Sequence, residues 1–317
     1  MLKPDGMHWS ASRFMLFSQC PRLYKSRYID GVVSEPSLAM LFGKATHTAL
    51  EAMHQGHRGT CLAGCADAGH RGLADPEARY TVGRTQFASE YAGLSETLEQ
   101  VGLLAPAALY ASGLRMLNQV AELGLNADGS STAERWFSLP TRETLGFPTI
   151  GAIDLWSPPD SQHGAVVWDF KTTAGAWGTA RAEREMWQPL LYTWAYRLVY
   201  DVIPVFKYVV LNRIQGTCEI FARTWTPRAW QDDLNGLMFQ AEEIAEAVID
   251  GNFECTRGHG TCLECGQPFG HDHVCADASR SARIKLGRHR EPVPLRADQQ
   301  VVTLDGTAWV QPSLTMR

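Results

Sequence analysis

Hydrophobic residues recur along the chain with two different periods, which divide it into helices and strands. A spacing of three and four residues, typical of helices, runs through 42–53, 77–125, 179–200 and 230–249. Short runs of β-branched and aromatic residues, typical of strands, fill 134–139, 151–156, 165–171, 205–211 and 219–225. A hairpin, a connecting helix and a returning strand form a mixed sheet, so the pattern predicts an α/β fold with helices flanking a mixed central sheet.

The strands at 151–156 and 165–171 predict a β-hairpin, because the residues between them are dense in turn formers. Side chains alternate across a strand, so Asp169 and Lys171 share one face. With Asp154 on the partner strand, two carboxylates and an amine could come together around a hard divalent cation. From this stretch alone, an ion pair on the surface of an ordinary hairpin is the favoured interpretation.

Two short helices are predicted near the N-terminus. Ser10 or Ser12 can cap the first and Pro21 can begin the second, with Cys20 at their junction. The second helix carries basic and aromatic side chains that fit either a phosphate backbone or a solvated helix face: Arg22, Tyr24, Lys25, Arg27 and Tyr28.

The chain has 317 residues, of which 45% are hydrophobic, and this is enough for a large core. Its formal net charge of -5 does not indicate a broad nucleic-acid-binding surface, although a local basic groove is compatible with it. There is no apolar signal region, and no apolar run approaches the roughly 20 residues that span a bilayer. We therefore expect a cytoplasmic protein whose eight cysteines are thiols or metal ligands.

Half of the cysteines fall within one short C-terminal stretch, which indicates a metal site: Cys255, Cys262, Cys265 and Cys275. A second Cys- and His-rich segment could bind zinc, but its spacing is not that of a recognised zinc module, and a Gly- and Ala-rich insertion loop is the simpler interpretation: His57, Cys61, Cys65 and His70. The patterns predict five regions, namely an N-terminal helical segment (1–53), a helical insertion (54–130), an α/β core (131–250), a metal-binding segment (251–280) and a basic, polar tail (281–317).

Taken in order, several motifs resemble those of the PD-(D/E)XK nucleases of the RecB-like exonuclease branch. They are His47 after Gly43, Asp154 in a Gly-x-Ile-Asp strand, Asp169-Phe170-Lys171, and Gln188-x-x-x-Tyr192. Each motif is short, but these four and a fifth near the N-terminus, in their order along about residues 10–275, are together specific. The fifth, Cys20-Pro21-Arg22-x-Tyr24, together with the late cysteines, resembles the iron–sulfur subset, which includes CRISPR-associated exonucleases and the helicase–nuclease AddB.

The resemblance implies a restriction-endonuclease-like core that hydrolyses DNA phosphodiester bonds with Mg²⁺ or Mn²⁺. Asp154 and Asp169 would be the central metal ligands, with the Phe170 carbonyl as a further oxygen and His47 completing the shell. Lys171 would orient or deprotonate the attacking water and stabilise developing charge.

Three more residues receive roles from the same resemblance. Gln188 and Tyr192 would contact the DNA backbone or support the lysine. Glu134 precedes the hairpin where the family often carries an acid, and it would bind a second metal or act through the other ligands.

The resemblance also implies a [4Fe–4S] cluster that joins Cys20 to three late cysteines. These would be Cys262, Cys265 and Cys275, or alternatively Cys255, Cys262 and Cys265. A third arrangement is a zinc site made by the four late cysteines, with His271 or His273 able to replace one of them. In each case the metal would be structural and would clamp the ends of the chain.

These observations predict a metal-dependent exonuclease that acts on single-stranded DNA or DNA ends in repair, recombination or phage replication. The chain contains no P-loop motif, so a helicase or recombination protein would be a separate partner. If the protein is phage-encoded, the compartment would be the cytoplasm of the host. One alternative is a catalytically silent DNA-end or protein-binding module, against which Asp154, Asp169 and Lys171 argue. The other is a zinc-ribbon adaptor, which leaves the order of the motifs unexplained.

Overall fold

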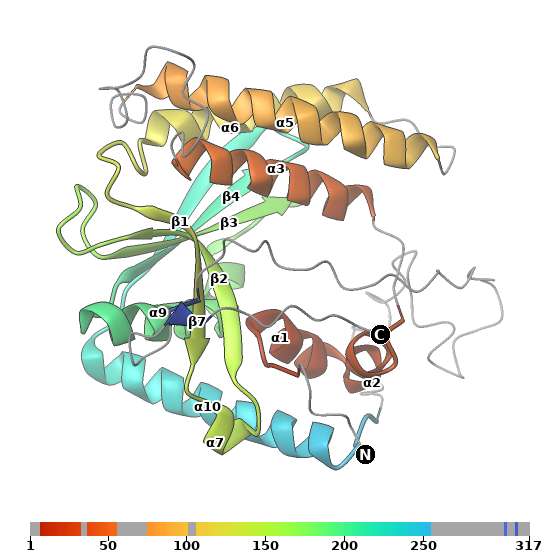
Figure 1. Ribbon diagram of the computed structural model, residues 1–317, viewed down its shortest axis with the longest axis vertical. Coiled ribbons are helices and arrows are strands. Elements are labelled where there is room, and N and C mark those ends of the chain that lie inside the picture. The colour runs from red at the N-terminus through yellow and green to blue at the C-terminus, as the bar shows by residue number, and fades with distance from the viewer. Residues whose placement is uncertain are drawn as a thin grey trace. The chain divides into compact units, whose positions relative to one another are not determined.

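The computed structural model describes residues 7–32, 37–55, 75–100 and 106–254, and the backbone of two short strands near the C-terminus (Figure 1). The helices are α1 (Ala11–Gln19), α2 (Pro21–Tyr24), a π-helix (Lys25–Ile29), α3 (Leu38–Gln55), α5 (Pro76–Glu99), α6 (Ala107–Leu123), α7 (Arg142–Leu145), α8 (Thr179–Arg184), α9 (Trp187–Tyr200) and α10 (Pro227–Ile249). The strands are β1 (Thr132–Leu139), β2 (Thr149–Ser157), β3 (Val166–Thr173), β4 (Val205–Asn212), β5 (Thr217–Arg223), β6 (Val301–Val302) and β7 (Ala308–Trp309). Among the described residues, no helix is long and apolar enough to cross a membrane.

The chain divides into two compact units. The central unit consists of Pro36–Arg135 and Ala152–Pro227, and the second unit consists of Met1–Glu35, Trp136–Gly151 and Arg228–Arg317. The predicted nuclease-site residues all belong to the central unit. The five regions predicted from the sequence stay a prediction.

Five strands form a mixed sheet in the order β5-β4-β3-β2-β1, and β6 and β7 follow beyond β1. Strands β2 and β3 are antiparallel, β3 and β4 are parallel, and β4 and β5 are antiparallel. The parallel pair is connected through α8 and α9, because two parallel neighbours need a crossover rather than a tight turn. The prediction of an α/β fold with a mixed sheet and flanking helices is therefore confirmed.

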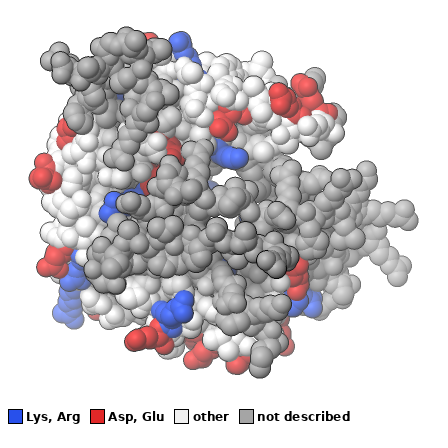
Figure 2. All heavy atoms as spheres, viewed as in Figure 1, with Lys and Arg blue, Asp and Glu red and all other residues white. Residues whose placement is uncertain are grey.

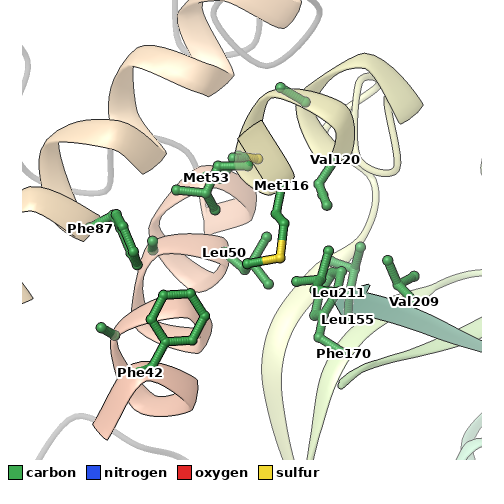
Figure 3. Close-up of a cluster of buried hydrophobic side chains, with 14 of the residues drawn as sticks. Phe42, Leu50, Met53, Phe87, Met116, Val120, Leu155, Phe170, Val209 and Leu211 are labelled. Atoms are coloured by element: carbon green, nitrogen blue, oxygen red, sulfur yellow. The ribbon is translucent and has the colours of Figure 1, made fainter. Parts of the chain in front are cut away.

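In the central unit, α3, α5 and α6 form a layer on one face of the sheet (Figure 1). Figure 3 shows their shared core, in which side chains from the three helices meet side chains from β2, β3 and β4: Phe42, Leu50, Met53, Phe87, Met116, Val120, Leu155, Phe170, Val209 and Leu211. The close packing of α6 on α5 depends on Gly113, where a Cβ would stand only 2.2 Å from the ring of Phe87. Each large side chain buried in this way contributes about 1.5–3 kcal/mol to folding.

The opposite face of the sheet is covered in this unit by α9, whose Tyr196 packs 4.9 Å from the ring of Trp156. The sequence predicted a single helix over 179–200, and this prediction was wrong, because α8 ends at Arg184 and α9 begins at Trp187. Pro189 explains the break. Proline has no N–H, and its ring clashes with the carbonyl four residues earlier, so it is tolerated only in the first turn of a helix.

The second unit contains the two predicted N-terminal helices. Ser10 caps α1 by accepting a hydrogen bond from the Arg13 N–H (3.3 Å), and Pro21 begins α2. Lys25, part of the predicted basic patch, pairs with Asp30 at 2.7 Å, so an acid already balances its charge.

Candidate active site

The two acids of the hairpin come together because of the register between β2 and β3. Leu155 pairs with Trp168, so one step further along the same register Asp154 stands opposite Asp169. The described backbone pairing ends before this step, and the Phe170 N–H donates to the Asp154 Oδ2 (2.6 Å) instead of to a strand. The strands therefore part at the two carboxylates.

Helix α3 brings His47 to the same place. The His47 Nδ1 lies 3.6 Å from the Asp154 Oδ1. The helix can approach β3 because Gly43, one turn before His47, has no side chain: a Cβ at that position would stand 3.0 Å from the Thr172 Oγ1. The glycine thus allows the helix to lie close to the β2–β3 hairpin.

Replacing Gly43 with alanine is expected to give no gain in stability, whereas the same change at Gly93 should raise the free energy of unfolding by about 0.5–1 kcal/mol. Alanine is the better helix former at both positions, but a Cβ at Gly93 meets nothing within 4 Å, while one at Gly43 crowds Thr172. Urea denaturation of the two variants checks this. Equal gains would show that the close approach of α3 is not required.

Lys171 makes an ion pair with the Asp169 Oδ2 on the same face of β3, as the alternation of side chains predicted. The Asp169 side chain is only 2% exposed, and the Lys171 side chain is 22% exposed. Apart from this ion pair, the Asp169 Oδ2 makes no hydrogen bond within the described residues. The interpretation of the hairpin as a surface ion pair does not hold, because the acid is buried.

The ionisation of these groups is unevenly divided. Burial raises the pKa of Asp169 to about 6, against the attraction of Lys171 and with the repulsion of Asp154. Burial also disfavours the Asp154 charge, but His47 and Lys171 outweigh it, so the pKa of Asp154 lies below its usual value. For His47, burial is outweighed by the attraction of Asp154, and its pKa is raised. The site therefore favours ionisation of Asp154 and disfavours ionisation of Asp169. A divalent cation would relieve the repulsion between the two carboxylates.

Glu134 adds a third acid, with an unusual backbone. It lies in β1 with a φ of 50°, in the left-handed region that non-glycine residues rarely occupy and that costs about 1–3 kcal/mol. Burial and the negative charges of Asp154 and Glu51 raise the pKa of Glu134 to about 8.

Glu51 is a further acid near the site, and sequence reasoning missed it. It lies on α3 four residues after His47, so both side chains lie on the same side of the helix, and this spacing could have found it. Its Oε1 accepts a hydrogen bond from the Gln55 Nε2 (2.5 Å).

Gln188 and Tyr192 lie in the first half of α9, and the Gln188 Nε2 donates to the Tyr192 hydroxyl (3.2 Å). Burial and the negative charges of Asp169 and Asp154 hold the pKa of Tyr192 well above its usual value. This hydroxyl is therefore neutral at physiological pH, beside the acids. The structure thus brings together all the predicted nuclease-site residues on β1, β2, β3, α3 and α9.

Within the described ranges, no group of three or more His, Cys, Asp or Glu side chains stands ready to coordinate a metal ion. The carboxylates contact Lys171 and His47 instead. The donor chemistry nevertheless fits Mg²⁺ or Mn²⁺, which take carboxylate oxygens and, for Mn²⁺, an imidazole. The Asp169 Oδ2 is buried and, apart from its ion pair with Lys171, makes no hydrogen bond within the described residues, so this carboxylate oxygen keeps acceptor capacity for an ion.

The comparison with protein families decides which group of proteins this is. The model of the PD-(D/E)XK nuclease superfamily matches residues 8–268. The chain belongs to the PD-(D/E)XK nuclease superfamily. No curated protein matches the chain at a significant level.

Among solved structures, the PD-(D/E)XK chain is similar to a candidate exonuclease from Eubacterium rectale. The two share 13% identity and a TM-score of 0.53, over 88% of this chain and 91% of the other. A second structure, of the protein SSO0001, shares 15% identity over 75% of this chain and 98% of the other, and its TM-score of 0.33 is too low to support an argument. The first likeness concerns the fold alone.

The predicted metal-binding cysteines are mostly outside the described residues. Cys20 is 3% exposed and lies between α1 and α2. Two groups of residues lie outside the described part of the chain. They are the late cysteines and histidines (Cys255, Cys262, Cys265, His271, His273 and Cys275) and the earlier Cys- and His-rich segment (His57, Cys61, Cys65 and His70). The iron–sulfur cluster and its zinc alternative stay predictions.

Proposed function

We propose that this nuclease is a metal-dependent exonuclease that hydrolyses DNA phosphodiester bonds. The observation that carries the proposal is the parting of β2 and β3 at Asp154 and Asp169, with Lys171 in contact with the second acid. Superfamily membership supports nuclease chemistry, and the Eubacterium rectale structure is itself described as a candidate exonuclease.

In the proposed mechanism, Asp154 and Asp169 would hold Mg²⁺ or Mn²⁺, and the Phe170 carbonyl and the His47 imidazole would assist them. The ion, when bound, supplies positive charge beside the scissile phosphate and activates water. Lys171 orients the attacking water and offsets the negative charge that develops on the phosphate.

The remaining acids and α9 complete the proposed site. Glu134, on β1, would either bind a second metal ion or act on the first ion indirectly through Asp154. Gln188 and Tyr192 offer neutral hydrogen-bonding groups beside the acids, and such groups suit a phosphate oxygen or the lysine. Acidic and basic side chains are mixed on the described part of the face in Figure 2, so substrate contacts on that face would be local.

Purified protein is expected to release short products from the ends of linear DNA when Mg²⁺ or Mn²⁺ is present, and none in EDTA. Asp154→Asn, which keeps the shape of the side chain but removes a charged ligand, should reduce the rate by about a thousandfold. Linear and circular single-stranded DNA, duplex DNA and matched RNA, separated on denaturing gels, distinguish the substrates. Cleavage in EDTA, or by Asp154→Asn at the normal rate, would refute metal-dependent catalysis at this site, and cleavage of circles would refute the requirement for ends.

A further inference from the structure

Helix α8 follows the catalytic strand and presents a guanidinium group that other side chains hold in place. None of its residues is buried, so it contributes little to the core. It is nevertheless tied to the sheet, because the Arg223 Nη1 on β5 donates to the Glu183 carbonyl (2.9 Å). Because α8 is short and exposed but held in place, we expect it to have a role other than stabilising the core.

Arg181 on this helix is oriented by two contacts. Its guanidinium carbon lies 4.0 Å from the centre of the Trp177 ring, and its Nε donates to the Glu185 Oε1 (3.1 Å). Neither contact uses the two terminal nitrogens of the guanidinium. These nitrogens have no protein acceptor within the described residues, and the Arg181 side chain is 47% exposed.

Trp177 destabilises the fold more than a purely apolar side chain at the same position would. It is 7% exposed, and its indole N–H is buried without a hydrogen bond among the described residues, which costs about 1–3 kcal/mol. A leucine or phenylalanine would avoid this cost. Tryptophan is, however, the best aromatic partner for a cation, so the ring is suited to holding Arg181.

The same aromatic side chains lead to the catalytic lysine. The Trp177 ring lies 5.5 Å from the ring of Tyr208, and the Lys171 Nζ lies 5.8 Å from the centre of that ring. Tyr208 pairs in register with Asp169, so it stands beside the acid on the neighbouring strand. The rings of Trp177 and Tyr208 thus lie between Arg181 and Lys171. At a rise of about 3.4 Å per nucleotide, a strand bound at the acids would pass Arg181 a few nucleotides from the scissile bond.

We propose that Arg181 binds a backbone phosphate of the nucleic-acid strand a few nucleotides from the scissile bond, with Trp177 as its platform. This inference rests on the proposed function. A guanidinium held through one face and its Nε presents both terminal nitrogens as a fork, the geometry that suits two phosphate oxygens.

Binding of a fluorescein-labelled single-stranded oligothymidylate, measured by anisotropy in EDTA over a range of salt, tests the proposal. Arg181→Gln should weaken binding about tenfold and lower the salt slope by about 0.7, because one phosphate contact to a single strand is lost. Arg184→Gln is the matched control, since it makes the same charge change on the same exposed helix, and it should weaken binding less than about twofold. Arg181→Lys should restore the slope but not the affinity, because lysine carries the charge without the fork.

Equal effects of Arg181→Gln and Arg184→Gln, or no effect of either, would overturn the phosphate site. Binding by Arg181→Lys equal to that of the wild type would overturn the role of the fork. The proposed function fails separately: wild-type protein that cleaves no DNA with Mg²⁺ or Mn²⁺ refutes the nuclease activity, while the binding comparison in EDTA can still be made.

Discussion

Replacing Asp169 with asparagine is expected to reduce DNA cleavage by about a thousandfold and to leave the protein at least as stable as the wild type. The loss of activity follows because the amide removes a charged metal ligand. The stability follows from burial: the Asp169 side chain is 2% exposed, and burying a charge costs several kcal/mol even when it is paired. An amide of the same shape avoids that cost, and the 22% exposed Lys171 can turn to water.

Lys171→Met is the informative comparison. It should lose as much activity, but it leaves the buried Asp169 carboxylate without its cation, and breaking a buried pair from this side costs about 3–5 kcal/mol. Single-turnover cleavage rates and urea denaturation of the two variants are the measurements. If Asp169→Asn were destabilised as much as Lys171→Met, the pair would be a structural feature rather than a site that sacrifices stability for function.

The stability of the protein is expected to fall in mild acid because of His54. This residue of α3 is 1% exposed, stacks on Phe170 with 5.7 Å between ring centres, and makes no hydrogen bond from either ring nitrogen among the described residues. Burial, with a smaller contribution from Arg79, lowers the pKa of His54 to about 3. The unfolded chain, with a pKa near 6.5, then takes up a proton that the folded protein refuses.

The direction of the effect follows from linkage. The neutral histidine is fully accommodated above about pH 6.5, and stability is lost as the pH falls from there towards 3, at about 1.4 kcal/mol per pH unit. Between pH 6.5 and 5 the wild type should therefore lose about 2 kcal/mol more than His54→Phe, which keeps the stacked ring but cannot be protonated. Urea denaturation at several pH values gives the difference. Parallel pH profiles for the two proteins would mean that His54 finds a partner for its proton.

The parts of the fold that depend on local pattern could be predicted from the sequence. The hairpin, its two acids and Lys171 follow from the alternation of side chains over neighbouring residues, and the structure shows the register that places Asp154 opposite Asp169. The break before α9 is predictable from Pro189, although the helical spacing of apolar residues continues across it.

Other features depend on contacts that no local pattern records. The left-handed backbone of Glu134 could not be foreseen, because glutamate is not a residue that favours this conformation. Glu51 is near the site only because α3 packs along β3. The burial of His54 was equally hidden, since a polar residue near the end of a helix is expected to face water.

The origin of His47 on α3 has a consequence for when the enzyme becomes active. Asp154 and Asp169 belong to one hairpin and can meet through a short loop, a fast and inexpensive closure. His47 reaches them only after α3 has docked, and that helix is separated from the hairpin by the whole of α5 and α6, which share its core. In a partly folded chain the two acids can therefore be in place while His47 is not. We expect nuclease activity to appear only once the whole central unit has folded.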